Sequence, residues 1–430
     1  MPRRFLQGAE TPAAPVNGVA LANKDYVDLD RLAPTDPLFA WWRNYGKRTS
    51  RACTVLGIGD SILFGQGLNV GTVPDNTNYM DTMTIQLQRL LNGVPAYGQR
   101  NWIEDAVNTS AVLDASMGGG YCVRPAIQGL GGFADPWRLV AGTTSYVARG
   151  MGIKSLQLNA SGRVSFTAPS ATGFLWWYED GASNLGTPAT SIYAGDYSTT
   201  RTGKMMENVA NPMNTGLAQY ARTFNAKMLP AQGKWTIEFS VASGTPLIDM
   251  LYVVDGDPSQ GVKVYNYAYG GKLSGDFAAN TTEANTAATA SPKLSGYYGD
   301  DVDLIILYIG ANDYANNINP TTFQANLEAI IDKYRAAQAR PQTFLLVSHF
   351  ARYDVVGPTY AWSQYQAAMK AVTSTRTQTD YLDLSTVFPA SQALDTDGDL
   401  VDSTGVHLTN YGQGWAAQMI ARKLMIPAVA

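Results

Sequence analysis

The hydrophobic positions along the chain fall into two alternating kinds of segment. Short apolar runs typical of buried parallel strands occur at Cys53–Gly59, Val262–Tyr267, Val302–Ile309 and Thr343–Ser348. Apolar residues recur at helical spacing in 80–92, 322–339, 359–374 and 410–424. Strands that alternate with helices in this way predict a three-layer, doubly wound parallel sheet with helices on both faces.

The segment between these two groups has a different pattern. It is rich in Gly, Thr, Ser and Asn, and apolar residues alternate with polar ones in Leu156–Phe166, Gly173–Tyr178 and Trp235–Val241. Such alternation between turn signals predicts antiparallel strands and a β-sandwich-like module. We therefore expect one discontinuous α/β domain, 37–110 and 262–430, interrupted by a β-rich module over 111–261. Residues 1–36 show no sustained apolar period and are expected to form a lead-in segment.

Composition narrows the class of protein. The chain has 430 residues, of which 45% are hydrophobic and 15% charged, which excludes global disorder. A net charge of -4 without a basic block argues against a nucleic-acid or anionic-membrane partner, and no apolar run is long enough for a membrane span. No apolar segment follows Arg3 and Arg4, so we expect no secretory signal. We expect Cys53 and Cys122 to be buried, reduced thiols.

Four polar motifs stand where predicted strands end or where the last helix begins. Gly59-Asp60-Ser61-Ile62 places a serine at the carboxyl edge of the sheet and at a helix N-terminus, which suits a nucleophile, although a serine there is also an ordinary helix cap. Tyr308–Asp313 offers the Asn312 amide as an oxyanion donor, Asn266–Gly271 offers a backbone amide at Gly271, and Gly405–Thr409 offers His407 as a base. Each of the last three is, by itself, a common turn or structural feature.

In this order the four motifs resemble those of the SGNH hydrolases, also called GDSL esterases. The resemblance covers about 50–108 and 262–428, and it implies the three-layer fold predicted above. It also implies Ser61 as nucleophile, His407 as general base, and an oxyanion hole made by the amides of Ser61 and Gly271 and the side chain of Asn312. The gap between Ser61 and Gly271 is unusually long for the family, and the inserted module accounts for it.

The orienting acid departs from the family pattern. An Asp usually stands three residues before the His, but Thr404 occupies that position and the nearest upstream carboxylate is Asp402. Either Asp402 reaches the imidazole, or a Ser-His dyad operates with the ring oriented by a backbone carbonyl or by Thr404. We favour Asp402. His349 also follows a strand, but no family motif falls on it, so we expect a structural or pocket-wall role.

Two further features of the sequence could be binding sites. Asp395–Asp399 departs from the spacing of a calcium loop, so an Asp- and Gly-rich turn is the better interpretation, and neither a metal nor another cofactor is expected. Trp176, Trp177 and Tyr178 could form a sugar-stacking platform, but adjacent residues of a strand face opposite ways, so at least one Trp is expected in the core.

The segment 21–28, Leu-Ala-Asn-Lys-Asp-Tyr-Val-Asp, resembles one found near the N-terminus of bacteriophage tail fibre proteins. This resemblance implies a tail component made in the host cytoplasm and carried on the virion. Such a protein would be attached to other tail proteins through its N-terminus and would form a homotrimer. The combined expectation is a phage-tail serine esterase that removes O-acetyl groups from a bacterial surface polysaccharide, such as capsule or O-antigen. One rival hypothesis is a non-catalytic, receptor-binding tail fibre that has kept the fold. A second is an ordinary bacterial lipase or polysaccharide esterase with no virion context.

Overall fold

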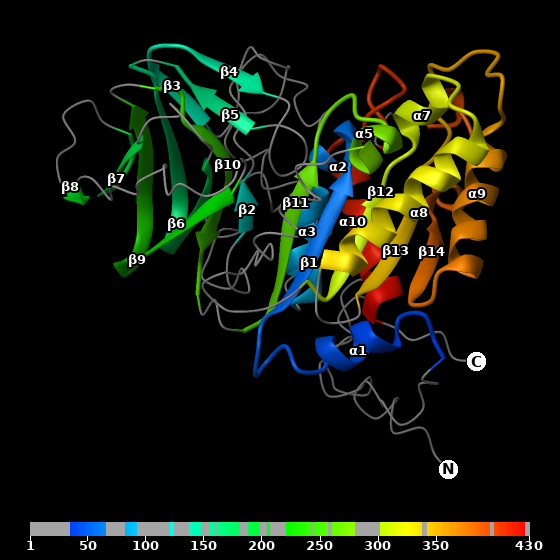
Figure 1. Cartoon of the computed structure of the whole chain (residues 1–430), viewed down its shortest axis with the longest axis horizontal. Coiled ribbons are helices and arrows are strands. Elements are labelled where there is room, and N and C mark those ends of the chain that lie inside the picture. Colours follow the sequence, from blue (N-terminus) through cyan, green and yellow to red (C-terminus); the bar gives the residue numbers. More distant parts are fainter. Residues whose placement is uncertain are drawn as a thin grey trace.

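The computed structural model describes most of the chain outside its N-terminal segment. The described residues are 35–65, 82–92, 121–123, 137–147, 155–159, 161–180, 188–197, 204–206, 221–241, 244–256, 260–279, 302–337, 342–395 and 400–425. They form an α/β domain beside an antiparallel β module (Figure 1). The predicted fold class is confirmed, whereas the lead-in segment lies almost entirely outside the described residues.

The α/β domain is built on a five-stranded parallel sheet in the order β11-β1-β12-β13-β14. Its strands are β1 (Cys53–Gly59), β11 (Val262–Ala268), β12 (Leu304–Tyr308), β13 (Thr343–Ser348) and β14 (Thr379–Asp383). The first four were predicted, and every residue in them is buried, as their continuous apolar runs require. The edge strand β14 was missed because its sequence, TDYLD, is polar and mostly half-buried.

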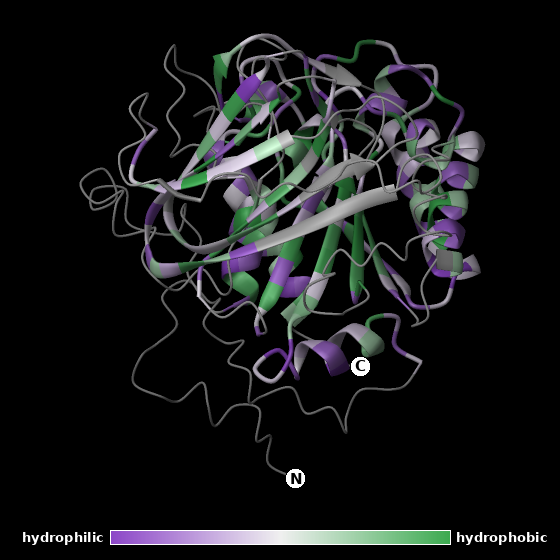
Figure 2. Ribbon diagram, turned by 60° about the vertical axis from the view of Figure 1, so that its left-hand side comes forward, coloured by the Kyte–Doolittle hydropathy of each residue, from purple (hydrophilic) through white to green (hydrophobic). Residues whose placement is uncertain are grey.

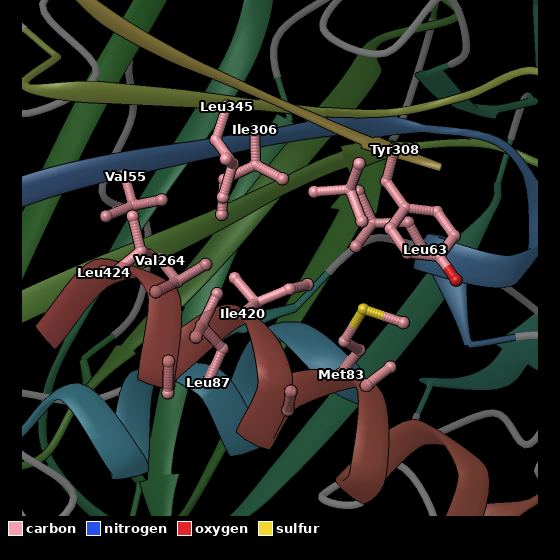
Figure 3. Close-up of a cluster of buried hydrophobic side chains, with 14 of the residues drawn as sticks. Val55, Leu63, Met83, Leu87, Val264, Ile306, Tyr308, Leu345, Ile420 and Leu424 are labelled. Carbon is pink, nitrogen blue, oxygen red and sulfur yellow. The ribbon is translucent and has the colours of Figure 1, made fainter. Parts of the chain in front are cut away.

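Helices cover both faces of this sheet. One face carries α1 (Phe39–Tyr45), α3 (Met83–Leu91) and α10 (Asn410–Met425), and the other carries α5 (Ser274–Ala279), α8 (Pro320–Ala337) and α9 (Trp362–Thr375). Figure 3 shows the first core, in which Val55, Ile306 and Leu345 of the strands face Leu87 and Ile420 of the helices. Figure 2 shows the consequence: the apolar strands lie in the interior, and the helices that cover them carry both polar and apolar residues.

Four short helical segments also belong to the described part of the α/β domain. They are α2 (Ser61–Phe64), α7 (Ala311–Ala315) and the 3-10 turns η9 (Leu384–Thr386) and η10 (Gln392–Leu394). Both α2 and α7 begin within three residues of the end of a parallel strand, so their N-termini lie at the carboxyl edge of the sheet. None of the described helices combines the length and apolar character that a membrane span needs.

The β module is a nine-stranded antiparallel sheet. Its strands are β2 (Tyr121–Val123), β3 (Trp137–Ala141), β4 (Thr144–Val147), β5 (Ser155–Leu158), β6 (Arg163–Asp180), β7 (Pro188–Ala194), β8 (Lys204–Met206), β9 (Ala221–Val241) and β10 (Leu247–Val254). The alternating stretch Leu156–Phe166 is not one strand: a turn through Ser161, whose φ is +62°, and Gly162 divides it into the end of β5 and the start of β6.

The module is sandwich-like because its two long strands fold back. Phe239 pairs with Val164 in the first half of β6, yet its ring also contacts Trp176, with ring centroids 6.2 Å apart. Twelve residues of straight strand would span about 40 Å, so β6 and β9 must bend between these points. The register of the two strands shifts between Ala168 and Gly173, which marks the bend.

The module leaves and rejoins the α/β domain at neighbouring points. Asn92, at the end of α3, accepts a hydrogen bond from the amide of Val262 at the start of β11 (2.7 Å) and donates one to its carbonyl (2.9 Å). The module also packs on that edge of the sheet, where the rings of Tyr252 in β10 and Tyr265 in β11 lie 5.2 Å apart. The insertion therefore leaves the strand-helix-strand unit around it intact.

Candidate active site

Three of the predicted motifs meet at the carboxyl edge of the parallel sheet. Gly59, at the end of β1, is aligned with Ala268 of β11 on one side and with Tyr308 of β12 on the other. Ser61, Gly271 and Asn312 follow these strand ends within two to four residues. The strand order reverses between β1 and β12, which is where ligands bind in doubly wound sheets.

Ser61 is the first residue of α2 and is 6% exposed. Asp60 caps this helix by accepting a hydrogen bond from the amide of Ile62 (3.0 Å), and Gly65 ends it with a φ of +97°. Burial raises the pKa of Asp60 to about 7 against the lowering effect of that hydrogen bond, and the nearby Asp313 carboxylate raises it further. The cap holds the Ser61 amide at the N-terminus of a helix, where it can donate to an anion.

His407 lies beside the serine. Its Nε2 atom is 3.1 Å from Ser61 Oγ, within hydrogen-bond distance, although the two residues are 346 positions apart in the sequence. The loop that carries His407 precedes α10 and is held to the loop after β13 by a hydrogen bond from the amide of Tyr353 to the carbonyl of Gly405 (2.9 Å). The pair therefore has the spacing that proton transfer from hydroxyl to imidazole needs.

Asp402 lies on the other side of the imidazole, with Oδ2 3.5 Å from His407 Nδ1. Its distance in sequence is bridged by a tight hairpin: Val401 pairs with Leu408 across an antiparallel bridge, so the next residues inward, Asp402 and His407, face each other. Gly405 makes the turn possible with a φ of +72°.

Thr404 contacts the carboxylate and not the imidazole. Its hydroxyl and amide both donate to Asp402 Oδ1, at 2.5 and 3.1 Å, and the His407 amide donates to the same oxygen at 3.2 Å. Burial alone would raise the pKa of Asp402, but the hydrogen bonds from His407 and Thr404 outweigh it and lower the pKa to about 2. Asp402 is therefore ionised at neutral pH.

Asn312 is held with its amide nitrogen towards the loop that contains Gly271. Its Nδ2 donates to the carbonyl of Lys272 at 3.1 Å, and its Oδ1 accepts from Nη1 of Arg352 at 3.1 Å. Gly271 is exposed and has a φ of +75°, with open space where a side chain would stand. The backbone N–H of Gly271 and the side-chain N–H of Asn312 thus lie at the same edge of the sheet as Ser61.

Sequence reasoning missed two contacts that fix this rim. Buried Asp313 accepts hydrogen bonds from the amide and hydroxyl of Ser274, at 3.0 and 2.5 Å, which joins α7, after β12, to the start of α5, after β11. Arg352 was also missed. Its place, four residues beyond the end of the buried strand β13, is the signal that could have drawn attention to it.

The remaining candidates lie elsewhere or carry no site. The His349 ring is fully buried against Trp362, with centroids 4.4 Å apart, and burial lowers its pKa to about 3, so it is neutral. Trp176 is fully buried in the module core and cannot belong to a sugar platform. The side chains of Trp177 and Tyr178 lie outside the described part of the structure. Asp395 accepts the amide of Val401 within its own loop, and residues 396–399 are not described.

The two cysteines, Cys53 and Cys122, are buried and not joined by a disulfide. Among the described residues, no group of three or more His, Cys, Asp or Glu side chains is placed to hold a metal ion.

Residues 252–415 match the model of the GDSL-like lipase/acylhydrolase family. This part of the chain is similar to that family. The matched segment includes Gly271, Asn312, Asp402 and His407 but begins after Ser61, which the structure brings to them through β1.

Among solved structures, one described as a peptidoglycan O-acetylesterase in action has a TM-score of 0.58 and 13% identity, covering 90% of this chain and 95% of that one. A family two carbohydrate esterase from Cellvibrio japonicus matches with a TM-score of 0.26 and 11% identity, covering 71% of this chain and 98% of that one. At these identities the likeness concerns the fold alone. Of the two structures, the one with a TM-score of 0.58 supports the fold, and the other carries no argument. No curated protein sequence matches the chain.

Proposed function

We propose that the chain is a serine esterase that removes O-acetyl groups from a bacterial surface polysaccharide. The observation that carries this proposal is the contact of 3.1 Å between His407 Nε2 and Ser61 Oγ, with the Asp402 carboxylate on the far side of the imidazole. Nucleophile, base and orienting acid thus follow one another in space, with the imidazole in the middle, as acyl transfer requires.

In the proposed reaction, Ser61 Oγ attacks the ester carbonyl while His407 Nε2 takes its proton. The amides of Ser61 and Gly271 and the side chain of Asn312 donate to the tetrahedral oxyanion. The intermediate collapses, the sugar hydroxyl leaves with the proton from His407, and an acetyl-serine remains. Water activated by His407 then releases acetate. Throughout, ionised Asp402 holds the imidazole and balances its positive charge.

Two observations support an O-acetylated glycan as the substrate class, of which capsule and O-antigen are the surface polysaccharides we propose. The structure with a TM-score of 0.58 is named as a peptidoglycan O-acetylesterase, and that name gives an O-acetylated glycan as its substrate. The β module packs on β11, the edge strand whose end leads to Gly271.

The virion context rests on residues 21–28 and their resemblance to tail fibre segments. We propose attachment to other tail proteins through residues 1–36 and a trimeric assembly. Deletion of 1–36 should leave esterase turnover intact and abolish incorporation into phage particles, and light scattering should give three times the chain mass. Loss of turnover in the deletion, or a monomer, would contradict this part of the proposal.

Hydrolysis of p-nitrophenyl acetate tests the reaction itself. The natural chain should turn over the ester, and Ser61→Ala should lose turnover while keeping the same thermal unfolding midpoint. Release of acetate from purified O-acetylated polysaccharides then identifies the substrate. A chain that binds such glycans but hydrolyses no ester would instead be a receptor-binding fibre that kept the fold.

A further inference from the structure

Arg352, in the loop between β13 and α9, is a charged side chain beside the site to which the reaction above gives no role. It carries no family motif, yet its side chain is only 14% exposed and reaches the Asn312 amide. We propose that Arg352 is a positioning residue for the oxyanion hole: it fixes the Asn312 amide so that its N–H faces the reacting carbonyl. The inference rests on the proposed esterase function.

The contacts of Asn312 have opposite polarity, which settles the orientation of its amide. A guanidinium can only donate hydrogen bonds, so the atom of Asn312 that contacts Arg352 must be the carbonyl oxygen. A backbone carbonyl can only accept, so the atom that contacts Lys272 must be the nitrogen. A flipped amide would place N–H against guanidinium and oxygen against oxygen, and both contacts would be lost. One N–H then remains available for an oxyanion.

Arg352 is itself held in place from the side away from Asn312. Asp354 accepts from its Nε at 2.9 Å and from its Nη2 at 2.6 Å, a two-pronged pair that leaves Nη1 directed at Asn312. The residue between them, Tyr353, donates its amide to Gly405 in the hairpin that carries His407. The series of hydrogen bonds from Asp354 through Arg352 to Asn312 is therefore anchored to the hairpin that carries His407.

The charge of Arg352 has a second consequence. A cation on the oxygen of a carboxamide polarises the group and makes its N–H a stronger donor. This effect grows when negative charge forms on the substrate oxygen, so it stabilises the transition state more than bound substrate. Loss of Arg352 should therefore lower kcat and leave KM nearly unchanged.

A double-mutant cycle tests the inference. Removal of one oxyanion donor typically lowers kcat about 10²- to 10³-fold, which is the expectation for Asn312→Ala. Arg352→Met should lower kcat about 10- to 100-fold with KM within about twofold, since it acts through that donor. In the Asn312→Ala background, Arg352→Met should cost nothing further. Arg352→Lys, which keeps a donor but not the fork, should fall between the natural chain and Arg352→Met.

The matched control is Arg376→Met. Arg376, at the end of α9, makes a similar two-pronged pair with Asp332 of α8. It should leave kcat unchanged. Full activity of Arg352→Met, or a double variant that loses the product of both single losses, would overturn the inference. If Arg352→Met is too unstable to assay, Arg352→Lys carries the same cycle. Failure of the proposed function is recognised separately, by undiminished turnover in Ser61→Ala.

Discussion

Asp60 provides a direct test of the electrostatics beside the nucleophile. The carboxyl group is fully buried, and burial raises its pKa from 3.8 to about 7. Between about pH 4 and pH 7 the folded chain therefore keeps a proton that the unfolded chain releases. Because the folded state binds more protons, the free energy of unfolding falls as pH rises through this window. Three pKa units at 1.36 kcal/mol each correspond to about 4 kcal/mol.

Asp60→Asn removes this titration. The amide is neutral at every pH, and its oxygen can still accept the hydrogen bond from Ile62 that caps α2. The free energy of unfolding of the variant should therefore increase relative to that of the natural chain as pH rises. From pH 5 to pH 8 the difference in free energy of unfolding between the two proteins should shift by about 3 kcal/mol in favour of the Asp60→Asn variant, the part of the window that lies above pH 5.

Urea unfolding followed by tryptophan fluorescence at pH 5 and pH 8 measures this shift. Titrating groups that do not interact with Asp60 are shared by the two proteins and cancel in the difference, as does any fixed cost of burying an amide. A difference that stays constant over this range, or that moves in favour of the natural chain, would show that the carboxyl group is ionised in the folded chain and would refute the reasoning.

Two further predictions concern the loop that carries the base and the helix after it. Asp402→Ala should lower kcat on p-nitrophenyl acetate by about 10²- to 10⁴-fold. Thr404→Ala removes only one hydrogen bond to that carboxylate, so it should lower kcat much less; the reverse order would assign the orienting role to the threonine. Gly412→Ala should lower the free energy of unfolding by about 1–3 kcal/mol, because an added Cβ would lie 2.0 Å from the carbonyl oxygen of Leu400. The control is Gly275→Ala, whose added Cβ meets nothing nearer than 3.4 Å and should leave the free energy of unfolding unchanged; thermal unfolding of both variants measures the difference.

The positions of the site residues followed from sequence because parallel strands share one direction. A polar motif directly after a buried strand must lie at the carboxyl edge, so the approach of Ser61, Gly271 and Asn312 needed only the four apolar runs. The fold was predictable for the same reason. Those runs are unbroken and alternate with helices, which is the pattern of a parallel sheet that is covered on both faces.

Contacts between side chains were not predictable in this way. The sequence favoured Asp402 as the partner of His407, but the pairing depends on a hairpin of six residues whose register is set by the positive φ of Gly405, and a family spacing of three gave no guide to that geometry. Arg352 has an ordinary sequence context, and its role depends on which atom of Asn312 it meets. The turn at Ser161 and Gly162 was hidden because the apolar alternation continues on both sides of it.

The same geometry explains how a large module can interrupt an enzyme fold without separating its site. Asn92, the last described residue before the module, and Val262, the first residue of β11 after it, bond directly to each other, so α3 and β11 stay side by side across the insertion. The module packs on β11 through Tyr252 and Tyr265, and β11 ends three residues before Gly271. The contact between module and α/β domain is therefore made on the strand whose end leads to one of the proposed oxyanion donors.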